Sequence, residues 1–334
     1  MPSSATTDVM GANSLAGTIA GSPAPMRPAT DGQVAPAPGP IAGSGPGSAT
    51  GPASLDKLQA VLAELAPVVV AFSGGTDSAF LAWVATTMLG ADAALCATAV
   101  SPSLAPEELE DCRALAREWG LAHVEVETHE LERSAYVANG ADRCFHCKSA
   151  LMDALDALDP LRSGSGSSTG SANGSSQRTV VLGVNVDDLG DHRPGQQAAA
   201  ERGARFPLVE AGFSKADVRE WSKHLGLRTW DKPAAACLSS RLPYGTPVTL
   251  GTLSSVAAAE SALRSMGLAA VRVRHYGDTA RIEVPLDDLA AVVGRRDEVA
   301  ARLHAAGYRY VTLDLDGLRS GNLNQALERR GVAP

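Results

Sequence analysis

The chain has 334 residues, a formal net charge of −8, 45% hydrophobic residues and only 4% aromatic residues. That length allows one large domain or two ordinary ones, and the hydrophobic share allows a sizeable core. The acidic balance and the scarcity of aromatic side chains argue against a nucleic-acid surface, so we expect no nucleic-acid partner.

The cysteines and the hydropathy pattern indicate the compartment. Five cysteines are an odd and sparse set for this length, which argues against a disulfide framework. No apolar run reaches the roughly 18 residues that a membrane span needs. The first basic residue is Arg27, so the N-terminal segment lacks the charged start of a signal peptide. We therefore expect no membrane partner and a reducing, cytoplasmic location.

Two segments lack the large apolar residues that a folded core requires. Residues 1–54 are rich in Ala, Gly, Pro, Ser and Thr, and residues 163–177 read SGSGSSTGSANGSSQ. Such compositions bury too little apolar surface to offset the entropy of ordering the chain. We expect a disordered tail at 1–54 and a flexible insertion at 163–177.

From residue 55 to about 232, short apolar runs alternate with helical patterns. Bounded β-branched runs predict buried parallel strands, and amphipathic runs predict helices. The expected strands are Val68–Phe72, Ala94–Val100, His123–Thr128 and Thr179–Val184. The expected helices are Thr76–Leu89, Pro106–Trp119, Arg143–Leu158, Gln196–Gly203 and Lys215–Leu225. Alternation of this kind is typical of an α/β fold with a doubly wound parallel sheet.

The pattern changes near Lys232-Pro233. The segments AVRVRHYG and ARIEV predict a hairpin whose turn lies near Gly277-Asp278. Further elements are expected as a helix at Leu253–Met266, one continuous helix at about Pro285–Ala306 and a strand at Tyr308–Leu313. We therefore expect residues 233–334 to form a smaller C-terminal α+β domain.

A polar, glycine-containing turn follows the first expected strand. It reads S-G-G-T-D-S over residues 73–78 and leads directly into a helix. A turn at the carboxyl end of a parallel strand faces the ligand crevice, and the N-terminus of the next helix favours an anion. The chain contains no Gly-Lys pair, so a G-x-x-x-x-G-K-[ST] loop is excluded.

This turn resembles the PP-loop of the N-type ATP pyrophosphatases, an adenine nucleotide hydrolase-like fold. Those enzymes split ATP between its α- and β-phosphates. The resemblance implies that the turn holds the pyrophosphate of ATP, through Ser73, Gly74, Gly75, Thr76, Asp77 and Ser78. The plain alternative is a glycine-rich turn that merely joins a strand to a helix.

Three cysteines form a candidate sulfur site. Cys144 and Cys147 have the C-x-x-C spacing that places both on one helical face, and Cys237 lies in KPAAACLSSRLPYG. Converging thiols can hold an iron–sulfur cluster with one open iron, or Cys237 can give up its own sulfur. Structural zinc lacks an obvious fourth ligand, because His146 would point away on a helix. The plain alternative is three reduced cysteines without a joint role.

The remaining cysteines, Cys96 and Cys112, fall in a predicted buried strand and a predicted helix. Both are expected to be core residues.

The expected hairpin carries several arginines. Arg272 and Arg274 alternate along one strand and so share a face, as do Arg281 and Glu283 on the facing strand. Two neighbouring arginines suit a phosphate, because each offers planar, multiple donors. The alternative is a solvated, salt-bridged hairpin.

Acidic residues follow the last strand of the expected parallel sheet. Asp187 and Asp188 lie where Mg²⁺ or a ribose can bind, and Asp188 is the tentative Mg²⁺ ligand. Their alternative role is in a turn or a helix cap. Lys215, at the start of a helix, contacts either pyrophosphate or solvent.

Segments that occur in order from residue 71 to residue 284 together resemble the LarE family of ATP-dependent sulfur transferases. They read AFSGGTDSAFL, RCFHCK, LGVNVDDLGDHRPG, FPLVEAGFSKADVR, WDKPAAACLSSRLPYG and VRVRHYGDTARIEV. The resemblance implies a pyridinium-3,5-dicarboxylate mononucleotide as substrate. Its carboxylates are adenylated with ATP and Mg²⁺ and converted to thiocarboxylates, in nickel-pincer nucleotide biosynthesis for lactate racemase and related enzymes.

The family has two sources of sulfur. Some members sacrifice a single cysteine, and others use three cysteines that hold a [4Fe–4S] cluster whose open iron carries a sulfide. This chain has three, Cys144, Cys147 and Cys237, so we favour the cluster. The single-cysteine members place their thiol one position away from Cys237, which weighs against its sacrifice.

The resemblance also implies further site residues. Arg272 and Arg274 would bind the phosphate of the substrate, while Ser240 and Arg241 would position it beside the sulfur. Glu260 matches an acidic position of the substrate site, although it can also be a charge on a helix surface. The family further implies a homo-oligomer, a hexamer.

Three other functions are alternatives that fit the sequence less well. An ammonia-using synthetase of the NAD synthetase type would not need the three cysteines. A tRNA thiolation enzyme would prefer a basic surface, which the net charge of −8 opposes. A non-catalytic nucleotide or iron–sulfur sensor would not need an intact S-G-G-x-D-S loop.

Overall fold

The computed structural model describes residues 54–158, 178–190, 194–233 and 236–319. The tail expected at 1–54 and the insertion expected at 163–177 lie outside the described residues, apart from Ser54. The hydroxyl of Ser54 accepts a hydrogen bond from the Asp56 amide and caps α1 (Leu55–Leu65), a helix that the sequence did not predict.

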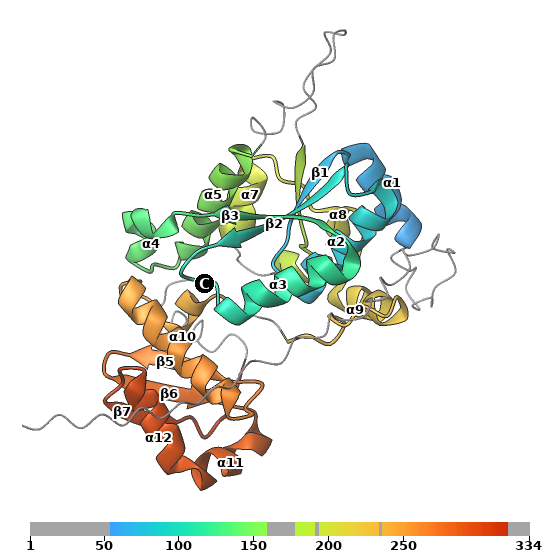
Figure 1. The fold of residues 1–334 in the computed structure, drawn as a ribbon. Helices are drawn as coiled ribbons and strands as arrows, with labels where there is room; N and C mark the ends of the chain where they lie inside the picture. The colour runs from blue at the N-terminus through green and yellow to red at the C-terminus, as the bar shows by residue number, and fades with distance from the viewer. Residues whose placement is uncertain (1–53, 159–177, 191–193, 234–235, 320–334) are drawn as a thin grey trace, which may run out of the picture. The chain divides into compact units, whose positions relative to one another are not determined.

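The strands of the first half form a parallel sheet of four (Figure 1). They are β1 (Val68–Ala71), β2 (Ala94–Val100), β3 (Ala122–Glu127) and β4 (Thr179–Leu182), in the order β3-β2-β1-β4. The chain first adds strands on one side of β1 and later on the other. The carboxyl end of β1 is therefore the switch point where open α/β sheets bind ligands. The expectation of a doubly wound α/β fold is confirmed.

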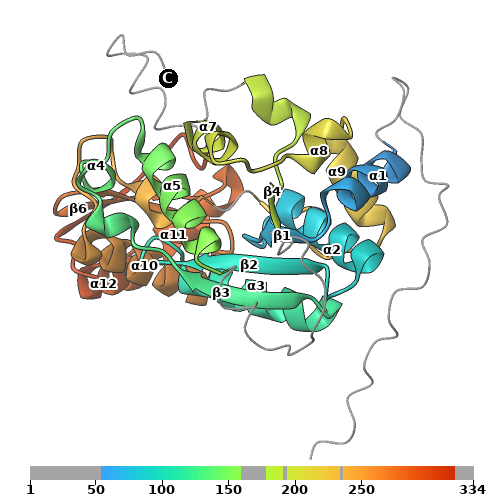
Figure 2. The same ribbon diagram turned by 90° about the horizontal axis from the view of Figure 1, so that it is seen from above.

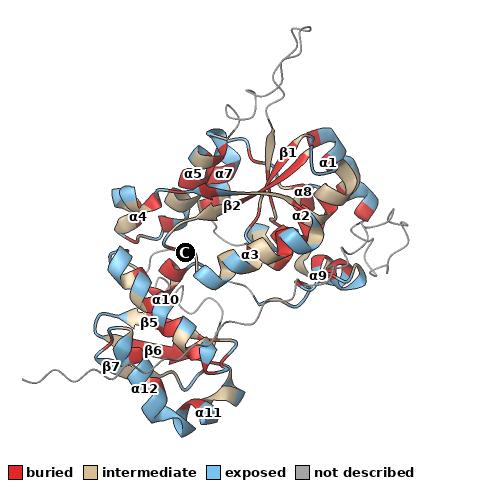
Figure 3. Ribbon diagram, viewed as in Figure 1, coloured by how far each residue is buried: buried red, intermediate tan, exposed pale blue. Residues whose placement is uncertain are grey.

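Helices cover both faces of this sheet, as the two views show (Figures 1 and 2). One face packs on α1, α2 (Thr76–Leu89), α3 (Pro106–Trp119), α8 (Pro207–Glu210) and α9 (Lys215–His224). The other packs on α5 (Arg143–Asp156) and α7 (Pro194–Glu201). Burial from both sides explains why β1 reads as a continuous apolar run, and Figure 3 shows that it is buried.

The C-terminal elements form a second, three-stranded sheet in the order β5-β6-β7. β5 (Arg272–Tyr276) and β6 (Thr279–Glu283) are the predicted hairpin, and β7 (Tyr310–Leu313) pairs with β6 in parallel. α10 (Leu250–Ser265) shares a separate apolar cluster with these strands.

The prediction of one continuous helix over Pro285–Ala306 was wrong. The segment holds a short 3₁₀ turn, η4 (Leu286–Asp288), then α11 (Leu289–Gly294) and α12 (Arg296–Ala305). Arg295 leaves the helical conformation with φ −111° and ψ 24°, and its Nη1 donates to the Met266 carbonyl at 2.6 Å. Val292 before the break and Val299 after it pack in the same apolar cluster.

No helix in the described part of the chain is both long and apolar enough to cross a membrane.

Candidate active site

The turn between β1 and α2 is closed by its own hydroxyl groups. The Ser78 hydroxyl accepts from the Ser73 amide at 3.3 Å, contacts Ser73 Oγ at 3.0 Å and donates to the Gly75 carbonyl at 3.1 Å. Gly75 is the N-cap of α2 and supplies no side-chain cap, so the first amides of the helix are open to an anion. The Ser78 hydroxyl thus shapes the loop, and the amides at the start of α2 are the groups there that an anion can bind.

Gly74 could not be replaced in this turn. Its φ is +68°, where a side chain is strained, and a Cβ would lie 2.8 Å from the Sγ of Cys112.

Cys112 and Cys96 are fully buried, as predicted, and burial raises the pKa of Cys112 to about 11 and that of Cys96 to about 12.

Residues that follow α9 form hydrogen bonds with the turn between β1 and α2. The Thr76 hydroxyl donates to the Thr229 carbonyl at 2.9 Å, so this predicted ligand turns its side chain away from the loop. Lys232 Nζ donates to the Gly74 carbonyl at 3.2 Å, to Glu108 at 2.8 Å and to Asp111 at 2.7 Å. A role for Lys232 could not be predicted from the sequence, because these contacts join residues more than a hundred positions apart.

The end of β4 lies against the start of α2. A Cβ on Gly183 would lie 2.7 Å from the Ser78 amide nitrogen, so only glycine permits this approach. One carboxylate oxygen of Asp77 accepts from Asn185 Nδ2 at 3.2 Å, and the other lies 3.6 Å from Lys215 Nζ. Asp77 and Lys215, both predicted site residues, are therefore neighbours at the carboxyl edge of the sheet.

Asp187 and Asp188 lie in the 3₁₀ turn η2 (Val186–Gly190) at the same edge. Asp187 accepts from the Lys215 amide at 2.8 Å, and Asp188 accepts from the Asn185 amide at 3.2 Å. Asp188 thus orders the turn, and Asp187 joins it to the first residue of α9, which agrees with the turn or capping role considered from the sequence. Both carboxylates lie close to the Asp77–Lys215 pair.

The three cysteines come from two segments. Cys144 and Cys147 lie on the first turns of α5, and Cys237 is the N-cap of η3 (Leu238–Arg241). Cys144 and Cys237 are exposed, and Cys147 is half-buried. Burial raises the pKa of Cys147 to about 12, with the charges of Cys237, Glu130 and Cys144 adding to the rise and Lys148 opposing it. The three sulfur atoms are therefore within electrostatic reach of one another.

The donor chemistry of this group fits an iron–sulfur cluster, because thiolates are the ligands that cluster irons prefer. The geometry supports a metal site less than the donor chemistry does. Among the described residues, no group of three or more His, Cys, Asp or Glu side chains is placed so that it could hold a metal ion. His146 contributes nothing here, because its Nε2 pairs with Asp142 at 3.0 Å.

A buried polar cluster positions Cys237. The Leu238 amide donates to the Ser103 carbonyl at 2.8 Å. The Tyr136 hydroxyl contacts the Ser103 and Ser239 hydroxyl groups, each at 2.6 Å. Desolvation raises the pKa of Tyr136, so the phenol stays protonated and available as a donor. Tyr136 could not be predicted as part of the site, because no neighbouring residue in the sequence indicates a contact with Ser239.

Glu260 is buried and is not the surface charge that one reading of the sequence allowed. Its carboxylate accepts from Arg241 Nε at 2.7 Å, from Arg264 Nη2 at 2.7 Å and from the Val273 amide at 3.0 Å. Arg241 Nη1 also contacts Ser240 Oγ at 3.0 Å. Glu260 therefore fixes Arg241 beside the segment that carries Cys237.

The two predicted phosphate ligands of the hairpin differ in their surroundings. They lie two positions apart on β5 and so share a face, as predicted. Arg274 is buried, pairs with Glu283 at 2.9 Å and donates to the Ser240 carbonyl at 2.7 Å. Arg272 donates to the Arg319 carbonyl, and burial together with the charges of Arg241 and Arg274 lowers its pKa. Arg272 is the better suited of the two to an anion.

No family model matches the chain. It is 38% identical over 277 residues to the pyridinium-3,5-bisthiocarboxylic acid mononucleotide synthase of Lactiplantibacillus plantarum, covering 83% of this chain and 95% of that protein. The chain belongs to the LarE family. The chain is also 45% identical over 277 residues to an uncharacterized protein of a Synechocystis strain, covering 82% of this chain and 98% of that protein. An uncharacterized protein of Methanocaldococcus jannaschii is 25% identical over 76% of this chain and 91% of its own.

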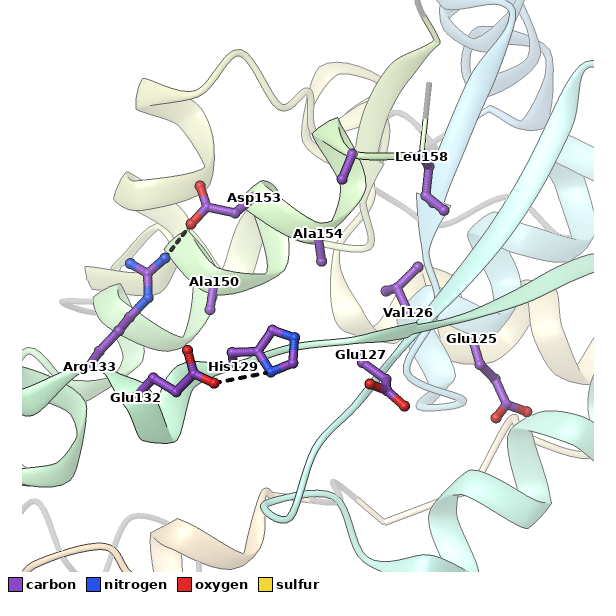
Figure 4. A pocket seen from close by; sticks show the side chains of 11 residues that line it. Glu125, Val126, Glu127, His129, Glu132, Arg133, Ala150, Asp153, Ala154 and Leu158 are labelled. Carbon is purple, nitrogen blue, oxygen red and sulfur yellow. Dashed lines mark hydrogen bonds and ion pairs between the residues drawn. The ribbon is translucent and has the colours of Figure 1, made fainter. Parts of the chain in front are cut away.

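A cavity of about 770 Å³ in this LarE-family chain lies apart from the predicted site residues (Figure 4). It is lined by β3, the 3₁₀ turn η1 (Glu130–Glu132) with its flanking residues, and α5. Its charged side chains are largely paired, Arg133 with Asp153 and His129 with Glu132. None of the predicted site residues lines it.

Proposed function

We propose that this LarE-family chain is an ATP-dependent sulfur transferase of nickel-pincer nucleotide biosynthesis. It would adenylate the carboxylates of a pyridinium-3,5-dicarboxylate mononucleotide and convert them to thiocarboxylates. The observation that carries this proposal is the 38% identity to a synthase named for the bisthiocarboxylic acid product. The ammonia-using, tRNA-thiolating and sensor alternatives have no comparable support.

In the first step, a substrate carboxylate oxygen bonds to the α-phosphorus of ATP as the bond to pyrophosphate breaks. The open amides at the start of α2 would hold the pyrophosphate, with Lys215 beside them. Asp77 and Asp188 fit Mg²⁺, because both carboxylates lie at this edge and Mg²⁺ takes only one or two protein carboxylates beside phosphate oxygens and waters. Bound Mg²⁺ would neutralise the charge that develops on the leaving pyrophosphate.

In the second step, a sulfur nucleophile attacks the acyl carbon and AMP departs. Arg272 would hold the phosphate of the mononucleotide, and Arg274 would act through its contact with Ser240. Arg241, oriented by Glu260, would hold the substrate beside Cys237 together with Ser240.

We propose that Cys144, Cys147 and Cys237 hold a [4Fe–4S] cluster, which when bound would supply a transferable sulfide at its open iron. Cys144 and Cys237 lie near enough to Cys147 to act on it electrostatically, which supports this source. Sacrifice of the Cys237 sulfur is the alternative. Iron and acid-labile sulfide in protein purified without oxygen, lost in Cys237→Ala, would support the cluster. Absence of iron, with a mass loss of one H₂S per chain after turnover, would support sacrifice.

Asp77→Ala tests the nucleotide site. We expect pyrophosphate release to be abolished while circular dichroism and melting temperature stay close to those of the wild type. Unchanged release would refute the PP-loop assignment.

Arg272→Ala combined with Arg274→Ala should raise the KM for the mononucleotide and leave the KM for ATP unchanged. The reverse pattern would show that the substrate site is misplaced.

We propose that residues 55–232 act as the nucleotide domain and residues 233–334 as the substrate-binding and oligomerisation domain, supported by their separate apolar clusters. We propose a homo-oligomer, a hexamer by family resemblance. We propose a cytoplasmic location, supported by five cysteines that are all free.

A further inference from the structure

Arg143 is a buried cation at the start of α5. Only 5% of the residue is exposed. Its Nη1 donates to the Asn139 side-chain oxygen at 2.6 Å and to the Ser239 carbonyl at 2.9 Å, and its guanidinium lies 5.9 Å from the centre of the Tyr244 ring. All of these partners are neutral. Across the described ranges, no carboxylate forms an ion pair with Arg143.

The other buried arginines of the site behave differently. Arg241 pairs with Glu260 at 2.7 Å, and Arg274 pairs with Glu283 at 2.9 Å. A buried charge without a partner of opposite charge is costly, so proteins seldom keep one unless an anion joins it. Among the buried arginines of the described residues, Arg143 is thus the exception.

Two sulfur atoms lie within reach of this cation. Arg143 directly precedes Cys144, and the carbonyl that it binds belongs to Ser239, two positions after Cys237. The charges of Cys237 and Cys144 act on Arg143, which places both sulfur atoms within electrostatic reach of the guanidinium. The hydroxyl groups of Tyr136 and Tyr244 are the other titratable groups that act on it.

We propose that Arg143 is the fixed positive charge of the sulfur site, a positioning residue that holds α5 against η3 and offsets negative charge carried by sulfur at Cys144 and Cys237. The anion class is sulfur-borne: thiolates, or a sulfide that they hold. Only this naming of the anion rests on the proposed function. The positive potential itself is a property of the folded chain.

The experiment compares two alkylating reagents of similar size and different charge. Full-length, reduced, iron-free protein is treated with iodoacetate or iodoacetamide at one pH and low ionic strength, and the rate at each cysteine is followed by peptide mass spectrometry. Both reagents attack the same thiolate, so the ratio of the two rates cancels the thiolate fraction and reports local potential. Buried Cys96 and Cys112 serve as internal unreactive sites.

We expect Arg143→Gln to lower the iodoacetate-to-iodoacetamide ratio at Cys144 and Cys237 by about three- to tenfold, as loss of a nearby unit charge requires. Arg143→Lys should keep the ratio within about twofold of the wild type, because it keeps the charge. The control is Arg117→Gln, which removes an exposed arginine paired with Glu110 and should leave both ratios unchanged. A folded Arg143→Gln variant with wild-type ratios would overturn the proposal.

If Arg143→Gln fails to fold, salt supplies the second measurement on the wild type. Raising ionic strength from about 0.01 M to about 1 M shortens the screening length from about 30 Å to about 3 Å. The ratio at both cysteines should fall toward that of glutathione. A ratio indifferent to salt would overturn the proposal. Neither ATP nor substrate is present, so a failure here is distinguishable from a failure of the sulfur-transfer reaction.

Discussion

Replacing Glu260 by Gln removes the negative charge on which the Arg241 and Arg264 guanidinium groups converge. Glu260 has no exposed surface and Arg241 is 5% exposed, so water cannot replace the lost partner. Removing one member of a buried ion pair costs about 3–5 kcal/mol. We take about 3 kcal/mol, because Gln keeps an oxygen that can accept from the Val273 amide. For a folded region of about 240 residues, that corresponds to a melting temperature lower by about 6–12 °C.

A matched control exists on the protein surface. Glu298 also lies between two guanidinium groups, those of Arg295 and Arg302, but it is 44% exposed. Glu298→Gln should therefore cost less than about 1 kcal/mol. Thermal melts of both variants give the stability difference, and the KM for the mononucleotide should rise in Glu260→Gln alone, because Arg241 loses its orientation. Equal melting temperatures for the two variants would refute the reasoning.

Gly183→Ala places a methyl group against backbone and should destabilise the protein by about 1–3 kcal/mol or more in chemical denaturation; Gly294→Ala, whose Cβ would meet nothing within 4 Å, is the control and should be harmless. Lys232→Met loses the contact with the Gly74 carbonyl and should raise the KM for ATP about tenfold, with the KM for the mononucleotide unchanged. Burial lowers the pKa of His123 below 6.5, so the unfolded chain binds the proton more readily and stability should fall as pH drops through 6.5. His123→Gln should flatten that slope in urea titrations at several pH values, and an unchanged slope would contradict this assignment.

The elements set by local pattern were predictable from the sequence. Thr76–Leu89, Ala94–Val100 and Pro106–Trp119 have the predicted bounds, because period, Pro and Gly mark their ends within a few residues. The break at Arg295 was not predictable, since it depends on a hydrogen bond to Met266, distant in sequence.

The site residues likewise include some that could be predicted from short motifs and others that depend on the tertiary structure. The S-G-G-T-D-S turn and the cysteine spacing are short motifs, and they could be read directly. The burial of Glu260, by contrast, depends on which faces of α10 and β5 meet. The position of Arg143 next to Cys144 can be read from the segment RCFHCK. Its neutral partners depend on the tertiary structure and could not be predicted from the sequence.

The most direct measurement is mass spectrometry of the product. Protein purified without oxygen is incubated with ATP, Mg²⁺ and the pyridinium-3,5-dicarboxylate mononucleotide, and the nucleotide products are quantified alongside. The account predicts that a carboxylate oxygen is replaced by sulfur, with AMP and pyrophosphate formed in equal amounts. Formation of AMP and pyrophosphate with ammonia incorporated, or with no sulfur in the mononucleotide, would contradict it.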